Sequence, residues 1–133
     1  MENYSLPQMT VGEVMTRSVM TVEKDAPIEE LVIKIKKHDF HSFPVVHRER
    51  LVGIVTKTDL LSVIDNKKLS NIAVNHIQDI MTPHPISITA DSSLREGADM
   101  MQKNHVRVLP VVDETRLIGL LSYSDLVRTV FKV

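Results

Sequence analysis

The chain repeats itself at a constant spacing. The run Gly53–Leu60 returns as Gly119–Leu126, and 119 − 53 gives an offset of 66 residues. The same offset aligns residues 11–62 with residues 77–128 without a gap, and 13 of these 52 aligned pairs are identical. A gapless duplication predicts two copies of one supersecondary unit. We expect the copies to pack about a pseudo-two-fold axis and to form paired binding sites in the clefts between them.

Length and duplication together predict one cooperative unit. The chain has 133 residues, about the length of one ordinary domain. Half of it alone would bury little surface and be marginally stable, so we expect the copies to share a core. The predicted organisation is a loose leader at residues 1–10, a first repeat at 11–66, a connector at 67–76 and a second repeat at 77–133.

Composition excludes several classes of protein. The net charge is −1, which gives no electrostatic reason to expect nucleic-acid binding. Cysteine is absent, so disulfides, thiol catalysis and thiolate metal sites are excluded. No stretch approaches the ~20 apolar residues of a membrane-spanning helix, and the N-terminus lacks an apolar signal core. We therefore expect a soluble cytoplasmic protein that does not contact a membrane.

Hydrophobic patterning predicts a mixed α/β fold in which each repeat runs β-α-β-β-α. In the first repeat a helix starts near Asp25-Ala26-Pro27 and carries its apolar residues on one face. A polar turn between two apolar runs predicts a hairpin in each repeat. The expected strands are 19–22, 43–46 and 51–55, then 85–88, 109–112 and 117–121; the helices that close the repeats start near 58–59 and 124.

Three motifs recur in the same order in both halves. They are a Met-Thr pair, a Pro-Val-Val strand, and Gly followed by two apolar residues, Thr or Ser, two further residues and Asp. With these motifs each half resembles a CBS domain, the small module named after cystathionine β-synthase, and the two in tandem resemble a Bateman module. The resemblance covers roughly residues 11–130.

The resemblance implies a regulatory function without catalysis. Such modules bind adenosyl ligands between their two repeats, and we expect AMP, ADP, ATP or S-adenosylmethionine as a regulatory ligand and no required cofactor. They commonly form homodimers and signal to a protein target by conformational change. Most are attached to an enzyme, channel or transporter, whereas this chain resembles a stand-alone member.

Two aspartates are the principal candidates for ligand contact. Asp59 and Asp125 each follow an apolar strand and fall in the first turn of a predicted helix. A carboxylate there can accept hydrogen bonds from both hydroxyls of a ribose, and the resemblance implies this role. The alternative is that both merely favour the helix dipole, which is worth ~0.3–1 kcal/mol.

Hydroxyl side chains accompany both aspartates. Thr56 and Ser122 lie at the strand ends, where they can either contact ribose or phosphate or cap the following helix. Thr58 and Ser124 compete for that capping role. We favour Thr56 and Ser122 as ligand contacts, because the family motif places them so.

Further candidates surround these motifs. His41 and Arg107 occupy one repeat position, where the resemblance implies a basic residue facing phosphates. Arg107 is always charged and His41 only partly so near neutral pH, so we expect Arg107 to matter more. The remaining candidates lie in the segments that begin each repeat: Thr16 and Thr82 at the entrance, with Met20 and Ile86 as apolar walls or as plain core.

Three other interpretations compete with the sensor. A structural or partner-binding module would keep the aspartates and bind no nucleotide. An enzyme related to inosine-monophosphate dehydrogenase would need a catalytic barrel that 133 residues cannot supply. A metal site would have to use scattered histidines, and we expect none.

A homodimer is expected from apolar residues on the closing helices: Leu60, Leu61, Leu126, Val127, Val130 and Phe131.

Overall fold

The chain forms two compact units. In the computed structural model, which describes residues 5–38, 41–65 and 76–131, one unit is Met20–Pro85 and the other combines Met1–Val19 with Ile86–Val133. We call the first the central unit and the second the terminal unit. Each is a mixed α/β structure with its own apolar core.

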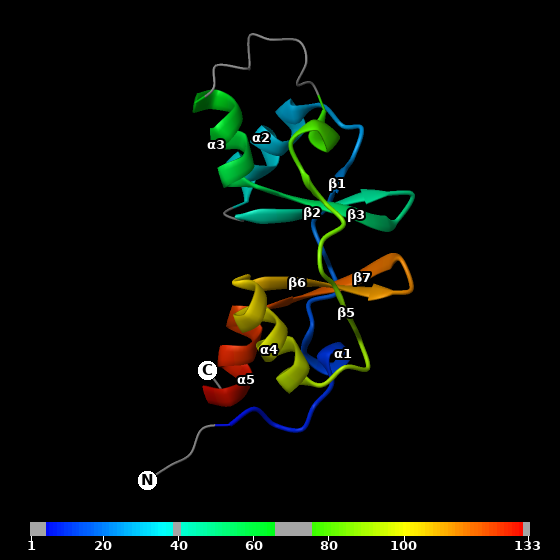
Figure 1. The fold of residues 1–133 in the computed structure, drawn as a ribbon, viewed down its shortest axis with the longest axis vertical. Coiled ribbons are helices and arrows are strands. Elements are labelled where there is room, and N and C mark those ends of the chain that lie inside the picture. Colours follow the sequence, from blue (N-terminus) through cyan, green and yellow to red (C-terminus); the bar gives the residue numbers. More distant parts are fainter. Residues whose placement is uncertain (1–4, 39–40, 66–75, 132–133) are drawn as a thin grey trace. The chain divides into compact units, whose positions relative to one another are not determined.

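The central unit carries four strands in the order β1-β2-β3-β4. The strand β1 (Val22–Glu23) runs parallel to β2 (Ser42–His47), which forms an antiparallel hairpin with β3 (Arg50–Thr56). Both α2 (Ile28–Lys37) and α3 (Lys57–Asp65) lie on one face of the hairpin (Figure 1). After the undescribed residues 66–75, where most of the predicted connector falls, come a short 3₁₀ helix, η2 (Ile77–Asp79), and β4 (Thr82–Pro83), which pairs with β3.

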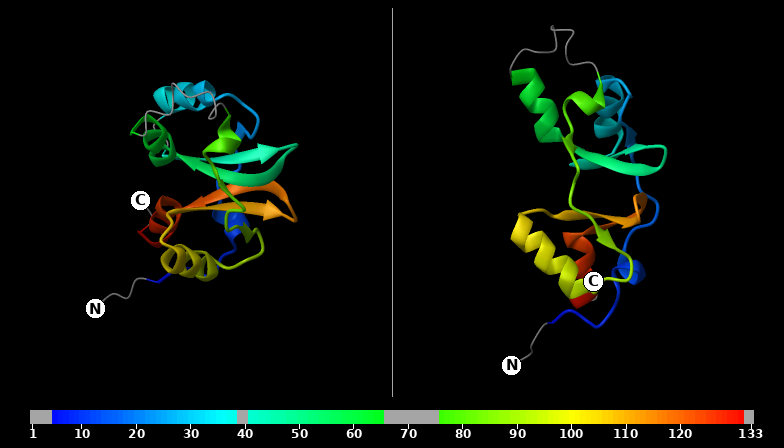
Figure 2. Two further views of the ribbon diagram at one scale, coloured as in Figure 1. Left: turned by 45° about the horizontal axis from the view of Figure 1, so that its top comes forward. Right: turned by 45° about the vertical axis from the view of Figure 1, so that its right-hand side comes forward.

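The terminal unit repeats this plan. The strand β5 (Ile88–Thr89) is parallel to β6 (Val108–Asp113), and β6 forms an antiparallel hairpin with β7 (Arg116–Ser122). Figure 2 shows α4 (Leu94–Asn104) and α5 (Tyr123–Phe131) on one face of that hairpin. The helix α1 (Val11–Val14) comes from the start of the chain.

The two repeats exchange their leading segments. In the terminal unit the backbone N–H groups of Val11 and Gly12 donate to carbonyls of Ser92 and Ala90, both at 2.8 Å. In the central unit the N–H of Ile77 donates to the carbonyl of Ala26 at 3.0 Å. Residues 11–19 therefore belong with the second repeat and residues 77–85 with the first. The compact units thus have boundaries different from those of the sequence repeats, because these leading segments complete the opposite sheet.

A glycine in each hairpin accommodates the exchanged segment. A Cβ atom on Gly119 would lie 2.6 Å from Sδ of Met15 and 3.0 Å from the carbonyl oxygen of Thr16. A Cβ atom on Gly53 would lie 2.5 Å from Sδ of Met81. The methionine that begins each repeat therefore packs directly on the hairpin of the other repeat, which is possible only where the strand has no side chain.

The hairpins and the apolar helix faces were predicted correctly, and the outer strands were not. Ile28 and Leu31 of α2 are buried, as the predicted stripe requires. The strand expected over 19–22 is reduced to Val22–Glu23, and that expected over 85–88 to Ile88–Thr89. Only these residues pair with β2 and β6, because the residues before them connect the two units.

The predicted leader is partly structured. Leu6 and Met9 pack against the apolar core of the terminal unit, and the carbonyl of Met9 accepts a hydrogen bond from the N–H of Leu94 at 3.1 Å. Apolar burial of this kind holds a segment that its proline content alone would leave irregular. In the part of the chain that the structure describes, no helix is long and apolar enough to cross a bilayer.

The exchange predicts a specific pattern of energetic coupling. Gly119→Ala should lower the free energy of unfolding by about 1–3 kcal/mol, because the new methyl group meets Met15. Met15→Ala should remove part of that clash, so the double variant should be more stable than the sum of the single effects by at least ~0.5 kcal/mol. Urea denaturation of the full chain measures these differences.

Met15→Ala combined with Gly53→Ala is the matched control, and its effects should add. Coupling of Met15 to Gly53 instead of Gly119 would show that the leading segments stay with their own repeats.

Candidate functional site

A reciprocal hydrogen-bonded pair marks the junction of β3 and α3. The N–H of Thr56 donates to Oδ2 of Asp59 at 2.8 Å, and the N–H of Asp59 donates to Oγ1 of Thr56 at 3.1 Å. The Thr56 hydroxyl also lies 3.0 Å from the same carboxylate oxygen. This is a capping box, which satisfies N–H groups that the first turn of a helix leaves free. It fixes both the end of the strand and the direction of the carboxylate.

The junction of β7 and α5 contains the same arrangement. The N–H of Ser122 donates to Oδ2 of Asp125 at 2.8 Å, and the N–H of Asp125 donates to Oγ of Ser122 at 3.1 Å. Of the two candidate caps in each repeat, the structure selects Thr56 and Ser122. Thr58 and Ser124 therefore do not take the capping role, which belongs to the two motif hydroxyls.

The loop before each hairpin is tied to the same helix start. The N–H of Lys57 donates to the carbonyl of His41 at 3.1 Å, and the N–H of Tyr123 donates to the carbonyl of Arg107 at 2.7 Å. The side chains of His41 and Arg107 are exposed. Each basic residue thus lies beside a capping box of its own repeat, with its side chain exposed to solvent.

Strand register brings the central unit's candidates to one end of its sheet. β3 ends at Thr56, which pairs with the first residue of β2, and Thr82 pairs with Ile54 two residues earlier. Met20 precedes β1 by two residues and packs at the edge of the same core. Five predicted residues are therefore grouped in the central unit: Met20, His41, Thr56, Asp59 and Thr82.

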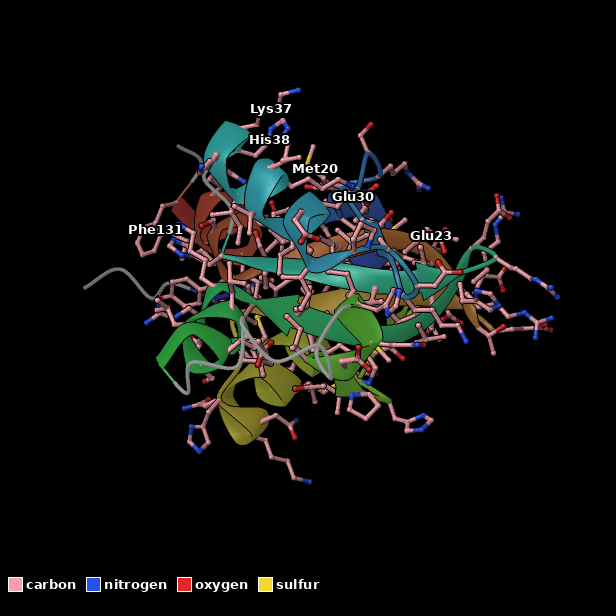
Figure 3. All side chains as sticks on the ribbon, turned by 90° about the horizontal axis from the view of Figure 1, so that it is seen from above. Met20, Glu23, Glu30, Lys37, His38 and Phe131 are labelled. Atoms are coloured by element: carbon pink, nitrogen blue, oxygen red, sulfur yellow. The ribbon has the colours of Figure 1, made fainter. Side chains whose placement is uncertain are left out.

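The segment that holds Met20 is anchored by a lysine of α2. The Lys34 Nζ donates to the carbonyl of Thr21, the residue after Met20. Figure 3 shows Met20 beside this helix, with Lys37 and His38 at the helix end. The second repeat has Met100 at the position of Lys34, so this anchor occurs once.

The terminal unit groups the other five candidates. Thr16 exchanges two 2.9 Å backbone hydrogen bonds with Leu120, two residues before Ser122. The set is therefore Thr16, Ile86, Arg107, Ser122 and Asp125. Thr16 begins the first repeat but lies beside the motif of the second, and Thr82 begins the second repeat but lies beside the motif of the first. The reason is that the leading segments are exchanged between the units.

The two carboxylates differ in one contact that the sequence analysis missed. Oδ1 of Asp125 accepts a hydrogen bond from Nη2 of Arg128 at 2.9 Å, one helical turn later. The corresponding residue in the first repeat is Ser62, whose hydroxyl donates to the carbonyl of Thr58. The i, i+3 spacing of Asp125 and Arg128 on one helix was the signal that could have revealed the pair.

Metal-binding geometry is not found at these positions. Within residues 5–38, 41–65 and 76–131, no group of three or more His, Cys, Asp or Glu side chains is arranged to hold a metal ion. The arrangement that the structure provides is instead a carboxylate, a hydroxyl and a nearby basic residue. Such groups suit a ligand that carries hydroxyls and an anionic group.

The capping role can be tested within the first repeat. Thr56→Ala should lower the free energy of unfolding by about 0.5–2 kcal/mol, because the Asp59 N–H loses its acceptor. Thr58→Ala, two residues later on the exposed first turn of the same helix, should change it by less than ~0.5 kcal/mol. Equal losses in the two variants, measured by urea denaturation, would contradict the assigned cap.

Comparison with known proteins identifies the family of this chain. The CBS domain family matches residues 11–66 and 77–132. The chain is 31% identical over 118 residues to inosine-5′-monophosphate dehydrogenase of Methanocaldococcus jannaschii, a match that covers 87% of this chain and 22% of the dehydrogenase. Another curated relative from that organism is 32% identical over 120 residues, and the chain spans 43% of its length.

Two solved structures resemble the whole fold. CBSX2 in complex with AMP superposes with a TM-score of 0.83 and 29% identity over 93% of this chain and 97% of that chain. The CBS domain pair of protein MJ0100, in complex with 5′-methylthioadenosine and S-adenosyl-L-methionine, gives a TM-score of 0.79 and 27% identity over 92% and 95% of the two chains. With both repeats matched and the duplicated strand–helix motif in place, this chain belongs to the CBS domain family and is a tandem CBS pair.

Proposed function

We propose that this CBS pair is a regulatory module that binds an adenosyl ligand at its duplicated strand–helix motifs. The observation that carries the proposal is the oriented carboxylate of Asp59. Its Oδ2 is used by the capping box, while among the described residues its Oδ1 accepts no hydrogen bond. A fixed carboxylate with a free oxygen is a suitable acceptor for a ribose hydroxyl. The AMP-bound and S-adenosylmethionine-bound relatives support this class of ligand.

Each candidate side chain has a role toward such a ligand. Asp59 and Asp125 accept hydrogen bonds from ribose hydroxyls, and Thr56 and Ser122 add a hydroxyl contact. Arg107 pairs with phosphate oxygens through its planar guanidinium group, and His41 does so more weakly.

Four further residues complete the proposed sites, and two of them, Thr16 and Thr82, lie in the exchanged leading segments. Thr16 is hydrogen-bonded to β7, and Thr82 pairs with β3, in each case two residues before the strand ends. Met20 and Ile86 offer apolar surface to a base.

The ligand acts by conformational coupling. A compound that binds one arrangement of the protein more tightly than another shifts the population toward that arrangement, and a protein partner reads the difference. No catalytic role is proposed, because the chain matches only 22% of the dehydrogenase and nearly all of the CBS pairs.

The competing function is a structural or partner-binding module without a nucleotide. The capping boxes favour it in one respect, since they give both aspartates a purpose that needs no ligand. A direct binding measurement separates the two functions.

Adenosyl compounds should stabilise the folded chain. A ligand that binds only the folded state adds RT ln(1 + [L]/Kd), about 2.7 kcal/mol at a hundredfold excess over Kd. We expect a rise in melting temperature with at least one of AMP, ADP, ATP, S-adenosylmethionine and methylthioadenosine, with GTP as the control nucleotide. If no adenosyl compound shifts melting or gives heat in calorimetry at millimolar concentration, the sensor proposal is wrong and the structural module replaces it.

The same calorimetry assigns roles to residues. Arg107→Ala should weaken AMP roughly ten- to a hundredfold, the value of a charge-assisted hydrogen bond, and should weaken adenosine little. Asp125→Ala should weaken both, because both carry the ribose. The unliganded variants must first be shown to remain folded at the assay temperature.

We also propose that the chain forms a homodimer through α3 and α5. Leu61 on α3 and Phe131 on α5 are 56% and 51% exposed, and the Phe131 ring stands out from the end of its helix in Figure 3. Two residues expected on this surface do not belong to it: Leu126 is buried in the core of the terminal unit, and Leu60 packs against that of the central unit. Large exposed apolar side chains favour a protein interface.

Light scattering should give about twice the chain mass of 15.1 kDa at micromolar concentration. Leu61→Glu with Phe131→Glu should reduce the mass to that of one chain, because a buried charge without a partner opposes association. Ile33→Glu is the matched control, since Ile33 is 54% exposed on α2, outside the proposed interface. A parent protein that scatters as a monomer would exclude the dimer.

A further inference from the structure

The two strand–helix motifs have the same pattern of residue types, yet their aspartate carboxylates make different contacts. The Asp125 side chain is only 8% exposed and pairs with Arg128 through Oδ1. Asp59 is partly exposed, and its Oδ1 accepts no hydrogen bond among the described residues. Oδ1 of the motif aspartate thus has a hydrogen-bond donor in the second repeat, and none among the described residues in the first.

The difference originates in a single aligned position. Arg128 and Ser62 are 66 residues apart and occupy the same place on α5 and α3, three residues after the motif aspartate. A serine at this position satisfies its hydroxyl on the carbonyl of Thr58, one turn back on the same helix. An arginine reaches the carboxylate instead, because side chains three residues apart face each other on a helix.

We infer that Arg128 competes with the ribose of the ligand for Asp125, so that a neutral nucleoside binds the Asp59 motif in preference to the Asp125 motif. This inference rests on the proposed function. A ribose hydroxyl must donate to Oδ1 of Asp125 while that oxygen already accepts a hydrogen bond from Arg128, or it must displace the guanidinium group. The Arg128 side chain is 59% exposed, so the pair is weak enough for a ligand to displace it.

The size of the effect follows from that exposure. An ion pair with one exposed partner changes an equilibrium by about two- to fivefold. Phosphorylated ligands would mask the effect, because Arg107 attracts their charge to the same repeat. Adenosine carries the ribose without the phosphate and is therefore the probe.

The experiment reads the two motifs separately in the intact protein. Nitrogen-15 NMR of the assigned amides of Thr58 and Ser124 reports the starts of α3 and α5 during an adenosine titration. Thr58 should reach half-saturation at a lower adenosine concentration than Ser124. Arg128→Ser should lower the midpoint at Ser124 by about two- to fivefold and leave Thr58 unchanged, and Ser62→Arg should raise the midpoint at Thr58 by a similar factor.

The control is Arg95→Ser, which removes an exposed arginine of the terminal unit and should move neither midpoint. Earlier saturation at Ser124 in the parent, or an unchanged or higher Ser124 midpoint in Arg128→Ser, would overturn the inference while leaving the proposed function intact. AMP binding without any adenosine binding would also overturn it, since the ribose would then contribute too little to be competed for. Absence of binding by every adenosyl compound removes the proposed function, and this inference with it.

Discussion

The hydrogen bond from the last strand residue to the first-turn aspartate organises each half of the molecule. It ends β3 at Thr56 and β7 at Ser122, starts the next helix, and holds the carboxylate of Asp59 or Asp125 in one direction. The loop before each hairpin then bonds to the same helix start through the carbonyl of His41 or Arg107. A structural requirement, the satisfaction of free N–H groups, thus places a carboxylate, a hydroxyl and a basic residue together.

The exchange of leading segments makes the two repeats interdependent. Each hairpin lacks a side chain at its glycine, and the methionine of the other repeat fills that space. A change in one leading segment therefore acts on the motif of the opposite repeat, since Thr16 is bonded two residues before Ser122 and Thr82 pairs two residues before Thr56. The leading segments thus connect each unit covalently to the repeat whose motif they do not flank.

The sequence predicted what depends on local pattern, and missed what depends on tertiary context. Apolar runs separated by polar turns predicted the hairpins, and the 3.6-residue period predicted the buried face of α2 with Ile28 and Leu31. The exchange was not predictable, because Met15 and Met81 are identical and either could pack on either glycine. The outer strands were predicted to begin too early in the sequence, because residues 19–20 and 85–86 connect one unit to the other.

The functional residues show the same division. The spacing of Thr56 and Asp59 could be recognised in the sequence. The sequence did not show that the two residues form a capping box, because Thr58 was an equally valid cap. Duplication predicted two sites that differ through His41 and Arg107, and the further difference between Ser62 and Arg128 was not predicted. The aligned positions 62 and 128 lie at the end of the duplicated region. Arginine at 128 pairs with Oδ1 of Asp125, whereas Oδ1 of Asp59 accepts no hydrogen bond from any residue that the structure describes. In a duplicated protein, an aligned pair that differs beside an identical functional residue is therefore the place to look for a difference between the sites.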